Sequence, residues 1–384
     1  MPDRWLALAL IFVTRVSMSV QFQSIASVGP LVVDDLHLSY AQLGTLVGLY
    51  LFPGVALALP GGFLARRVGE RRTVVWSLGI MVVGGLLTAW SGSFAMAAVG
   101  RVLSGAGGVL MNMALLKLTA DWFAERELAT AMAVMLTAWP FGLGAAVATL
   151  GALATATSWR TSIAVASATA LLGMALMALV FRDPPARAAA GTSARLRRRD
   201  VSLAVSSGAA WGVFNVAFVV VVAFAPAMLV ARGLSLGHAG LLASLAIWVS
   251  IVSVPLGGML SDRIGRPSVM IVVGCVVGTA LVLWLPAMPS AMVGLLLLGA
   301  IAGAVPGPLT SLLPRALAPE RLAVGLGVSY TTFYLVMAGG QPAAGLARDL
   351  TDDPAAPVLF AAAAMAATVL GLLAFRLIET GDRR

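Results

Sequence analysis

Hydrophobic residues along the chain fall into long, nearly unbroken runs that short polar segments separate. A helix that crosses a bilayer needs about 20 predominantly apolar residues, and twelve runs approach or reach this length. The predicted spans are 5–31, 41–64, 73–92, 94–118, 128–155, 161–181, 201–230, 239–261, 268–287, 291–313, 322–347 and 355–376. The alternating segments of about ten residues that mark an outer-membrane barrel do not occur. The pattern predicts an all-α polytopic membrane protein with twelve transmembrane helices.

Composition agrees with lipid as the solvent. Hydrophobic residues make up 60% of the chain and charged residues only 11%, with a mean hydropathy of +0.98. A soluble protein of this length must cover its surface with more charge. The single cysteine, Cys275, lies inside a predicted span, so no disulfide framework is expected. The first apolar run is too long for a signal peptide and is predicted to be a retained first helix.

The net charge of +9 is distributed unevenly among the loops. Basic residues gather at both termini, in the middle segment and in alternate loops, whereas the opposite loops hold only Arg160, Arg232 and Arg348. The positive-inside rule then puts both termini and the middle loop in the cytoplasm. The basic residues therefore set the topology of a multi-pass inner-membrane protein, and they predict no nucleic-acid partner.

The polar segment 182–200 divides the chain into two similar halves. It predicts an N-terminal six-helix bundle at 1–181, a cytoplasmic linker at 182–200 and a C-terminal six-helix bundle at 201–384. A shift of 196 residues aligns Ser39 with Ser235 and Gly44 with Gly240, and it also aligns a run of glycine, leucine and arginine at 61–69 with 257–265. Parallel six-helix repeats of this kind are the plan of one class of transporters.

Two loops carry the most specific motif in the sequence. The segment 258–266 reads G-M-L-S-D-R-I-G-R and resembles the signature G-x-L-x-D-R-x-G-R of the major facilitator superfamily. The loop at 62–71 repeats it, except that Arg66 stands where aspartate is usual and Glu70 where a basic residue is usual. The segment 101–108 is similar to the family's R-x-x-x-G-x-G-x-G pattern.

This resemblance implies a fold of two bundles that rock about a central cavity, and a latch between them on the cytoplasmic side. The residues that would form this gate are Gly62, Arg67, Gly69, Gly258, Asp262, Arg263, Gly265 and Arg266. Arg66 puts the N-terminal copy of the latch in doubt, and the alternative is that these charges only fix topology. Within the superfamily, 111–144 and 326–360 look most like the bacterial cyanate-permease-like group.

Three charged residues lie inside predicted spans: Arg15, Arg101 and Lys117. A charge at the centre of a bilayer costs at least about 2.5–3.5 kcal/mol, so each is a functional candidate. The family resemblance implies that the first and fourth helices line the cavity, where two guanidinium groups would clamp a carboxylate or another planar oxyanion. The alternatives are that Arg101 braces a helix contact and that Lys117 snorkels to the interface.

Polar and aromatic residues on other spans complete the predicted substrate site. They are Gln21, Asn112, Trp211, Asn215, Tyr330 and Tyr334. Every acidic residue lies in a terminus, a loop or a helix end, and both histidines fall in loops, which favours an anionic over a cationic solute. The sequence holds no metal-ligand cluster and no nucleophile with a positioned base, so no metal, cofactor or enzymatic activity is expected.

The leading hypothesis is a secondary active or facilitative transporter of a small carboxylate or oxyanion that works by rocker-switch alternating access. Its expected partners are the anion, the lipid bilayer and a co-transported or exchanged ion, and it is expected to act as a monomer. The alternative is an exporter of neutral or amphipathic compounds in which the buried arginines are structural. A third hypothesis is a membrane sensor that transports nothing.

Overall fold

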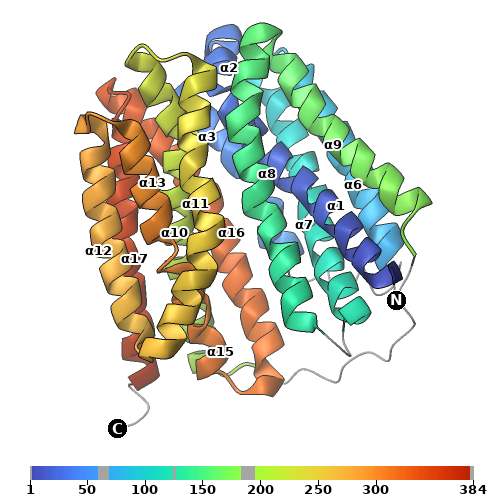
Figure 1. Cartoon of the computed structure of the whole chain (residues 1–384), viewed down its shortest axis with the longest axis vertical. Coiled ribbons are helices and arrows are strands. Elements are labelled where there is room, and N and C mark those ends of the chain that lie inside the picture. Colours follow the sequence, from blue (N-terminus) through green and yellow to red (C-terminus); the bar gives the residue numbers. More distant parts are fainter. Residues whose placement is uncertain (1, 59–68, 124–126, 183–194, 381–384) are drawn as a thin grey trace.

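The structure is a computed structural model that describes residues 2–58, 69–123, 127–182 and 195–380, and every regular element in these ranges is a helix (Figure 1). The N-terminal helices are α1 (Pro2–Ser27), α2 (Gly29–Leu36), α3 (Tyr40–Leu49), α4 (Pro53–Leu57), α6 (Glu70–Ala89), α7 (Phe94–Phe123), α8 (Leu128–Ala156) and α9 (Trp159–Leu179). The C-terminal helices are α10 (Arg198–Ala231), α11 (Leu236–Ile264), α12 (Pro267–Trp284), η1 (Leu285–Ala287), α13 (Ala291–Ala302), α14 (Pro306–Thr310), α15 (Leu312–Ala316), α16 (Pro319–Thr351) and α17 (Ala356–Thr380).

Within the described ranges, twelve stretches are helical, long and apolar enough to cross a membrane, which is the number that the sequence predicts. Several helices run past their predicted ends. Helix α7 continues to Phe123 instead of residue 118, and α16 spans Pro319–Thr351 instead of 322–347. Several charged residues that follow the apolar runs therefore lie in the first or last turns of helices.

Two predicted spans are not continuous helices. In the span 41–64, α3 ends at Leu49 and α4 begins at Pro53. In the span 291–313, α13 ends at Ala302 and the short helix α14 begins at Pro306. Proline has no backbone N–H to continue the preceding helix, but its fixed φ angle suits the first turn of a new one. Both stretches are still long and apolar enough to cross a membrane, and hydropathy alone does not detect such breaks.

Positions that the internal repeat pairs have the same local structure. The hydroxyls of Ser39 and Ser235 each accept the backbone N–H three residues later, at 3.2 and 3.3 Å, and so cap α3 and α11. Gly44 lies against the backbone of α16 and Gly240 against that of α8, so closely that a Cβ atom on either would clash. These glycines allow two pairs of helices to approach each other.

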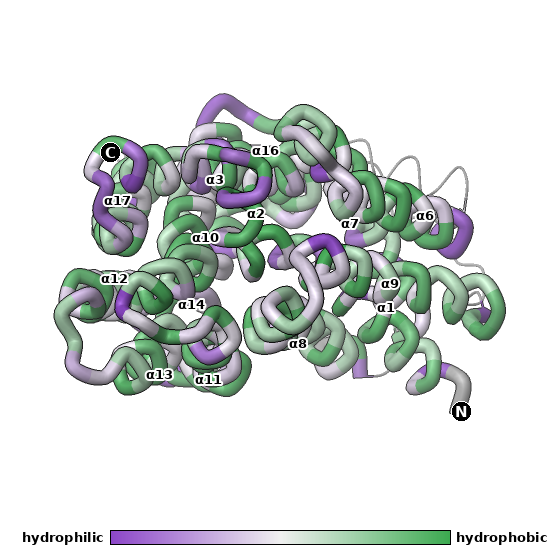
Figure 2. The backbone as a smooth tube through the Cα atoms, turned by 90° about the horizontal axis from the view of Figure 1, so that it is seen from above, coloured by the Kyte–Doolittle hydropathy of each residue, from purple (hydrophilic) through white to green (hydrophobic). Residues whose placement is uncertain are grey.

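The N-terminal and C-terminal helices meet along these same two pairs. Helix α3 packs along α16, and α8 packs along α11, while α1 also contacts α10. Seen from above, the two pairs lie where the two groups of helices meet (Figure 2). The close contacts run from the Tyr40–Gly345 pair, at the end remote from the termini, to the Gly54–Tyr334 pair deeper in the molecule.

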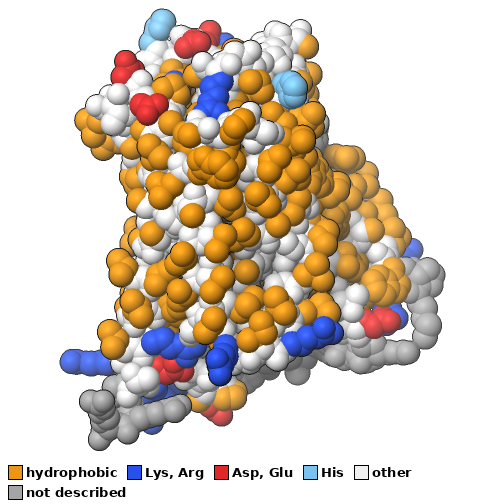
Figure 3. All heavy atoms as spheres, turned by 60° about the vertical axis from the view of Figure 1, so that its left-hand side comes forward, with side chains coloured by type: hydrophobic (Ala, Val, Ile, Leu, Met, Phe, Trp, Pro, Cys, Tyr) orange, Lys and Arg blue, Asp and Glu red, His pale blue; other side chains and the backbone are white. Residues whose placement is uncertain are grey.

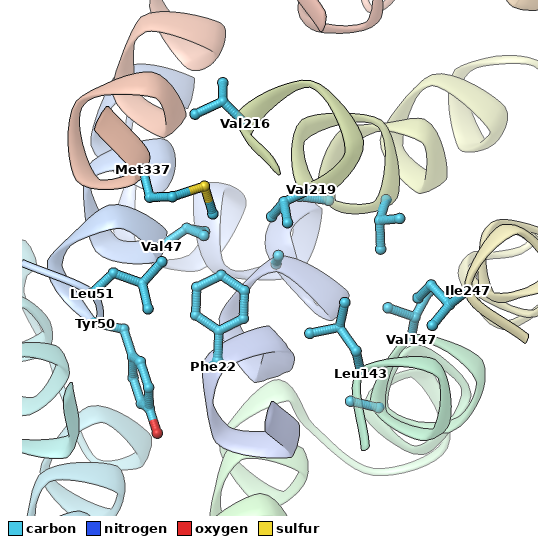
Figure 4. Close-up of a cluster of buried hydrophobic side chains, with 14 of the residues drawn as sticks. Phe22, Val47, Tyr50, Leu51, Leu143, Val147, Val216, Val219, Ile247 and Met337 are labelled. Carbon is cyan, nitrogen blue, oxygen red and sulfur yellow. The ribbon is translucent and has the colours of Figure 1, made fainter. Parts of the chain in front are cut away.

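A cluster of buried hydrophobic side chains fills the space between these helices (Figure 4). We call it the apolar plug, and its labelled members are Phe22, Val47, Tyr50, Leu51, Leu143, Val147, Val216, Val219, Ile247 and Met337. They come from α1, α3, α8, α10, α11, α16 and the break between α3 and α4, where Tyr50 and Leu51 lie. Since every one of them is almost wholly buried, the plug closes the space between the two groups of helices at this level.

The surface has a wide hydrophobic middle between two polar ends. Figure 3 shows hydrophobic side chains covering most of this face. Most of the visible lysine and arginine side chains lie near the lower end, together with some acidic ones, and the histidine side chains lie at the upper end with acidic and a few basic ones. Figure 1 places both termini at the same lower end. A wide apolar belt between polar ends is the surface that a membrane-embedded protein presents to lipid.

Candidate functional site

Arg15 lies on α1 in the interior of the molecule, with only 7% of its surface exposed. Its Nη1 donates to the side-chain oxygen of Asn112 on α7 at 2.6 Å and lies 2.9 Å from the sulfur of Met135 on α8. Its Nε is buried and finds no acceptor among the described residues, and no described carboxylate forms an ion pair with it. Arg15 is therefore a buried cation with hydrogen-bonding capacity left over.

Two tyrosines of α16 face Arg15 from the C-terminal helices. Tyr330 and Tyr334 both lie near its guanidinium group, and their rings lie 6.5 Å apart. Asn112 also lies near the Tyr334 side chain, while Tyr330 keeps 43% of its surface exposed. Arg15, Asn112, Tyr330 and Tyr334 thus form one polar site, which we call the Arg15 site, with side chains from α1, α7 and α16.

Arg101 on α7 has a different environment, although it is also buried, with 2% exposed. Its Nε donates to the carbonyl of Leu46 at 2.8 Å, Nη1 to that of Gln21 at 2.7 Å and Nη2 to that of Phe22 at 2.8 Å. Its guanidinium carbon lies 4.7 Å from the ring centre of Tyr50. These bonds join α7 to α1 and α3, and they use all three guanidinium nitrogens within the N-terminal helices.

Gln21 and Lys117 are also engaged within the N-terminal helices. The Gln21 side-chain amide donates to the carbonyl of Met81 on α6 at 3.1 Å. The Lys117 ammonium pairs with Glu70 at 2.8 Å and with Asp121 at 2.7 Å, and 42% of its side chain is exposed. In this conformation the structure links neither residue to the Arg15 site.

Trp211 and Asn215 on α10 line a cavity of about 480 Å³ that α8, α11, α13 and α14 also enclose. The Asn215 amide donates to the carbonyl of Trp211 at 2.8 Å. The Trp211 ring stacks on Phe333 with ring centres 6.1 Å apart, and Phe333 in turn lies 5.3 Å from Tyr334. A row of aromatic rings therefore connects this cavity with the Arg15 site.

A second contact between the two groups of helices lies at the end remote from the termini. The Asp349 carboxylate on α16 accepts the backbone N–H groups of Tyr40 at 2.8 Å and Ala41 at 2.7 Å, which begin α3. The neighbouring Arg348 guanidinium lies 3.6 Å from the centre of the Tyr40 ring. A carboxylate at a helix N-terminus is favoured by the unpaired N–H groups and by the helix dipole. This contact fastens α3 to α16.

Residues 10–341 match the family model of the Major Facilitator Superfamily. This chain belongs to that superfamily. It is also 25% identical over 273 residues to the probable sulfoacetate transporter SauU of Cupriavidus necator, in an alignment that covers 66% of this chain and 62% of that protein. A stretch of 70 residues is 36% identical to Azole resistance protein 1 of Saccharomyces cerevisiae and covers 18% of this chain and 11% of that protein. The chain thus spans less than two thirds of the length of either relative.

Solved structures of the same fold cover the chain from end to end. A bacterial homologue of the human lysosomal transporter Spinster, in an inward-facing and occupied conformation, matches with a TM-score of 0.73 at 17% identity over 100% of this chain and 97% of that one. Its inward-facing and unoccupied structure matches with a TM-score of 0.72 at 18% identity, over 100% and 98%. At this identity the match concerns the fold alone. The finer similarity to the cyanate-permease-like group stays a prediction.

The superfamily's loop signature is only partly within the described residues, because Gly62 and Arg67 lie outside them. Gly69 before α6 and Gly265 after α11 both have positive φ angles, of 93° and 68°, which glycine adopts without strain.

In the C-terminal copy, Asp262 pairs with Arg315 at 3.1 Å, and both belong to the C-terminal helices. Gly258 and Arg263 lie on the last turns of α11, and Arg266 directly precedes α12. The Asp262–Arg315 ion pair is thus internal to the C-terminal helices, and the latch between bundles stays a prediction.

The sequence interpretation missed three parts of this arrangement. Met135 touches Arg15, but an ordinary methionine in an apolar span gives no signal of its own. The sequence indicates only that Asp349 lies in a loop or at a helix end, although the S-x-x-Q pattern at Ser39 does predict the start of the helix that Asp349 caps. The apolar plug is invisible in a sequence in which most residues are hydrophobic.

Proposed function

We propose that this protein is a transporter that carries a small organic anion across the inner membrane, with Arg15 as its principal ligand. The observation that carries this proposal is the buried Arg15 guanidinium, whose Nε has no acceptor among the described residues. A charge this deep in a membrane protein costs at least about 2.5–3.5 kcal/mol unless something compensates for it. An anionic solute would supply the partner that the described part of the chain does not.

Alternating access would come from the rocking of two six-helix bundles, residues 1–181 and 201–384, about the Arg15 site. The apolar plug and the Asp349–Tyr40 contact close the end remote from the termini. The many lysine and arginine side chains near the other end support a cytoplasmic location for that end and for both termini (Figure 3). The structure then corresponds to a state closed toward the outside, and the fold similarity to inward-facing crystal structures supports this assignment.

An anionic substrate also agrees with the charges and with one relative. The probable sulfoacetate transporter is named for an anionic solute. The side chains that act electrostatically on Arg15 are the two tyrosines, with no carboxylate from the described residues. Since proton relays use carboxylates or histidines inside the membrane, facilitated diffusion or anion exchange fits this site more simply than proton coupling. The pathway lies within one chain, which suits a monomer.

A second candidate is an exporter of neutral or amphipathic compounds. The large apolar cavity beside Trp211 and the short similarity to Azole resistance protein 1 favour it. In that case Arg15 would serve only to hold α1, α7 and α8 together, and neutralising it would leave ligand binding intact.

Thermal unfolding of the detergent-purified chain distinguishes the two candidates. The probes are acetate, 4-methylbenzoate, sulfoacetate and sulfate, with benzyl alcohol and tetraphenylphosphonium as neutral and cationic amphiphiles. A ligand at about 100 times its dissociation constant should add roughly 2.7 kcal/mol to the free energy of unfolding. We expect at least one anion to stabilise the native protein but not Arg15→Gln, whereas Arg72→Gln, which removes an exposed charge, should respond like the native protein.

The opposite result would support the exporter. If only the amphiphiles stabilise the protein, and if they do so equally in Arg15→Gln, Arg15 is structural and the anion proposal fails.

A further inference from the structure

The cavity of about 480 Å³ is large for an inorganic oxyanion or a two-carbon acid. Small-molecule sites of this kind measure roughly 300–1,000 Å³ and enclose most of the ligand's surface. Much of the wall is aromatic or branched aliphatic, including Trp139, Trp211, Phe214, Phe218, Val219 and Ile251. Such a wall favours a ligand with an apolar body, because burial of that body removes apolar surface from water.

The threonine, serine and asparagine side chains in this wall donate to backbone carbonyls of their own helices. The hydroxyl of Thr137 donates to the backbone carbonyl four residues earlier at 2.6 Å, and that of Ser250 to the carbonyl three residues earlier at 2.7 Å. Asn215 donates to the carbonyl of Trp211. No lysine, arginine or histidine lines the cavity among the described residues. An anionic group placed in it would lose its hydration without gaining a charged partner.

The charges around the site allow one anionic group. Arg101 donates from all three of its nitrogens to backbone carbonyls, and Lys117 is paired with two carboxylates. Among the described residues at the centre of the molecule, Arg15 is the cation whose guanidinium retains an unbonded buried nitrogen. A substrate with two negative charges would bring one charge more than the site can neutralise.

Two contacts link the Arg15 site to the cavity. Met135 contacts Arg15 at 2.9 Å and lies one helical turn from Trp139, whose side chain lines the cavity. Trp211 lines both this cavity and a smaller one of about 110 Å³. Tyr330 of the Arg15 site lines the smaller cavity.

We infer that the substrate is an organic monoanion whose single charged group binds Arg15 and whose apolar body fills the cavity beside Trp211. This inference rests on the proposed function and adds the charge and shape of the substrate. It also assigns Trp211 a role in selectivity that is separate from the charge recognition by Arg15.

A matched set of three acids tests the inference on the native protein. 4-Methylbenzoate and terephthalate differ only in whether a methyl group or a second carboxylate stands opposite the first carboxylate, and acetate has the carboxylate without the ring. Binding is measured by isothermal titration of the purified full-length chain. We expect 4-methylbenzoate to bind at least about tenfold more tightly than terephthalate, since the second charge would enter the apolar cavity. Acetate should bind at least about tenfold more weakly than 4-methylbenzoate, since it leaves the cavity empty.

One variant tests the role of the cavity wall. Trp211→Ala should weaken 4-methylbenzoate about tenfold and leave acetate within about twofold, because acetate does not reach the wall. Trp76→Ala is the matched control, since Trp76 lies on α6 with 65% of its surface exposed and far from this wall in the chain. If Trp211→Ala does not fold, the comparison of the three acids on the native protein still tests whether the substrate is a monoanion with an apolar body.

The possible failures are distinguishable. If terephthalate or acetate binds as tightly as 4-methylbenzoate and Arg15→Gln abolishes that binding, the inference is overturned while the proposed anion transport stands. If no anion binds, or if Arg15→Gln binds all three acids like the native protein, the proposed function itself fails and the inference fails with it.

Discussion

Arg15 and Arg101 are the same side chain in two apolar spans, and they are almost equally buried, with 7% and 2% exposed. Arg101 donates from each of its three nitrogens to a backbone carbonyl at 2.7–2.8 Å. Arg15 donates to one side-chain amide, lies beside a methionine sulfur and keeps an Nε without an acceptor among the described residues. The extent of burial therefore does not distinguish a structural arginine from a functional one. The hydrogen bonds that the arginine makes do distinguish them.

One of the three bonds of Arg101 follows from the break after α3. Helix α3 ends at Leu49, and the N–H of Tyr50 turns to the carbonyl of Val47 at 3.4 Å instead of that of Leu46. The Leu46 carbonyl is then one of the unpaired acceptors that every helix end leaves. Arg101 supplies the missing donor, and this explains why a guanidinium group stabilises the fold at this place.

The largest effect should come from Arg101→Gln, which removes most of these bonds. Each buried carbonyl left without a donor costs about 1–3 kcal/mol, so we expect the free energy of unfolding to fall by about 3–5 kcal/mol. Thermal denaturation followed by tryptophan fluorescence measures this loss. Arg15→Gln removes the same charge, yet it should change stability by less than about 1 kcal/mol because Arg15 leaves part of its capacity unused. Equal losses of unfolding free energy in the two variants would contradict the distinction between a structural Arg101 and a functional Arg15.

Asn112→Asp should neutralise the positive charge of the Arg15 site. It places a carboxylate where an amide oxygen now lies 2.6 Å from the Arg15 Nη1. Because this internal ion pair competes with the ligand, we expect 4-methylbenzoate to bind about 30-fold to 100-fold more weakly, equivalent to roughly 2–3 kcal/mol. Isothermal titration gives the affinity. Asn112→Ala removes the contact without adding charge and should cost less than about tenfold, so an equal loss in both variants would rule out neutralisation as the cause.

Arg15→Lys should have a smaller effect on binding. The ammonium group keeps the positive charge but loses the planar pair of donors that fits a carboxylate. We expect the affinity for 4-methylbenzoate to fall about tenfold, or roughly 1.4 kcal/mol, whereas Arg15→Gln abolishes measurable binding. If lysine and glutamine at this position are equally damaging in the same titration, the charge of Arg15 is not what attracts the ligand.

The sequence predicts the spans and the internal repeat well because both depend on local patterns. Lipid requires long apolar helices, so hydropathy predicts twelve spans, and the repeat pairs Ser39 with Ser235 and Gly44 with Gly240, which do share local structure. The family signature is equally local. Helix breaks are harder, since of the prolines within apolar spans Pro53 and Pro306 begin new helices while Pro140 lies inside α8.

The sequence predicts which unusual residues belong to the candidate site, but it does not predict the contacts that they make. The sequence identifies Arg15 and Arg101 as unusual, but their partners come from segments 55 to 120 positions away, such as Leu46 and Met135. Which carbonyls and side chains meet a guanidinium group depends on how helices bend and pack, and neither is encoded in hydropathy. The ligand's size and charge likewise follow from a cavity that several distant helices enclose.

The smallest effect should come from Asp349→Asn, which leaves both arginines in place and changes access to the Arg15 site. The carboxylate of Asp349 fastens the first turn of α3 to α16, and the loss of its charge should cost roughly 1 kcal/mol in the state seen here. The balance would then shift about fivefold toward a state in which the apolar plug opens.

A cysteine at Val47, in the plug, reports this opening through its rate of labelling by a membrane-impermeant thiol reagent added from outside. Cys275 is buried and is replaced by alanine in all variants. Asp352→Asn removes an equivalent charge three residues further along and should label like the parent protein. If the cysteine in Asp349→Asn is labelled no faster than in the parent protein, the contact between Asp349 and α3 does not hold the outer end closed. The same conclusion follows if the cysteine in Asp352→Asn is labelled as fast as in Asp349→Asn. A faster rate, with Arg101-dependent stability unchanged, would show that the outer closure and the Arg101 brace are separate structural elements.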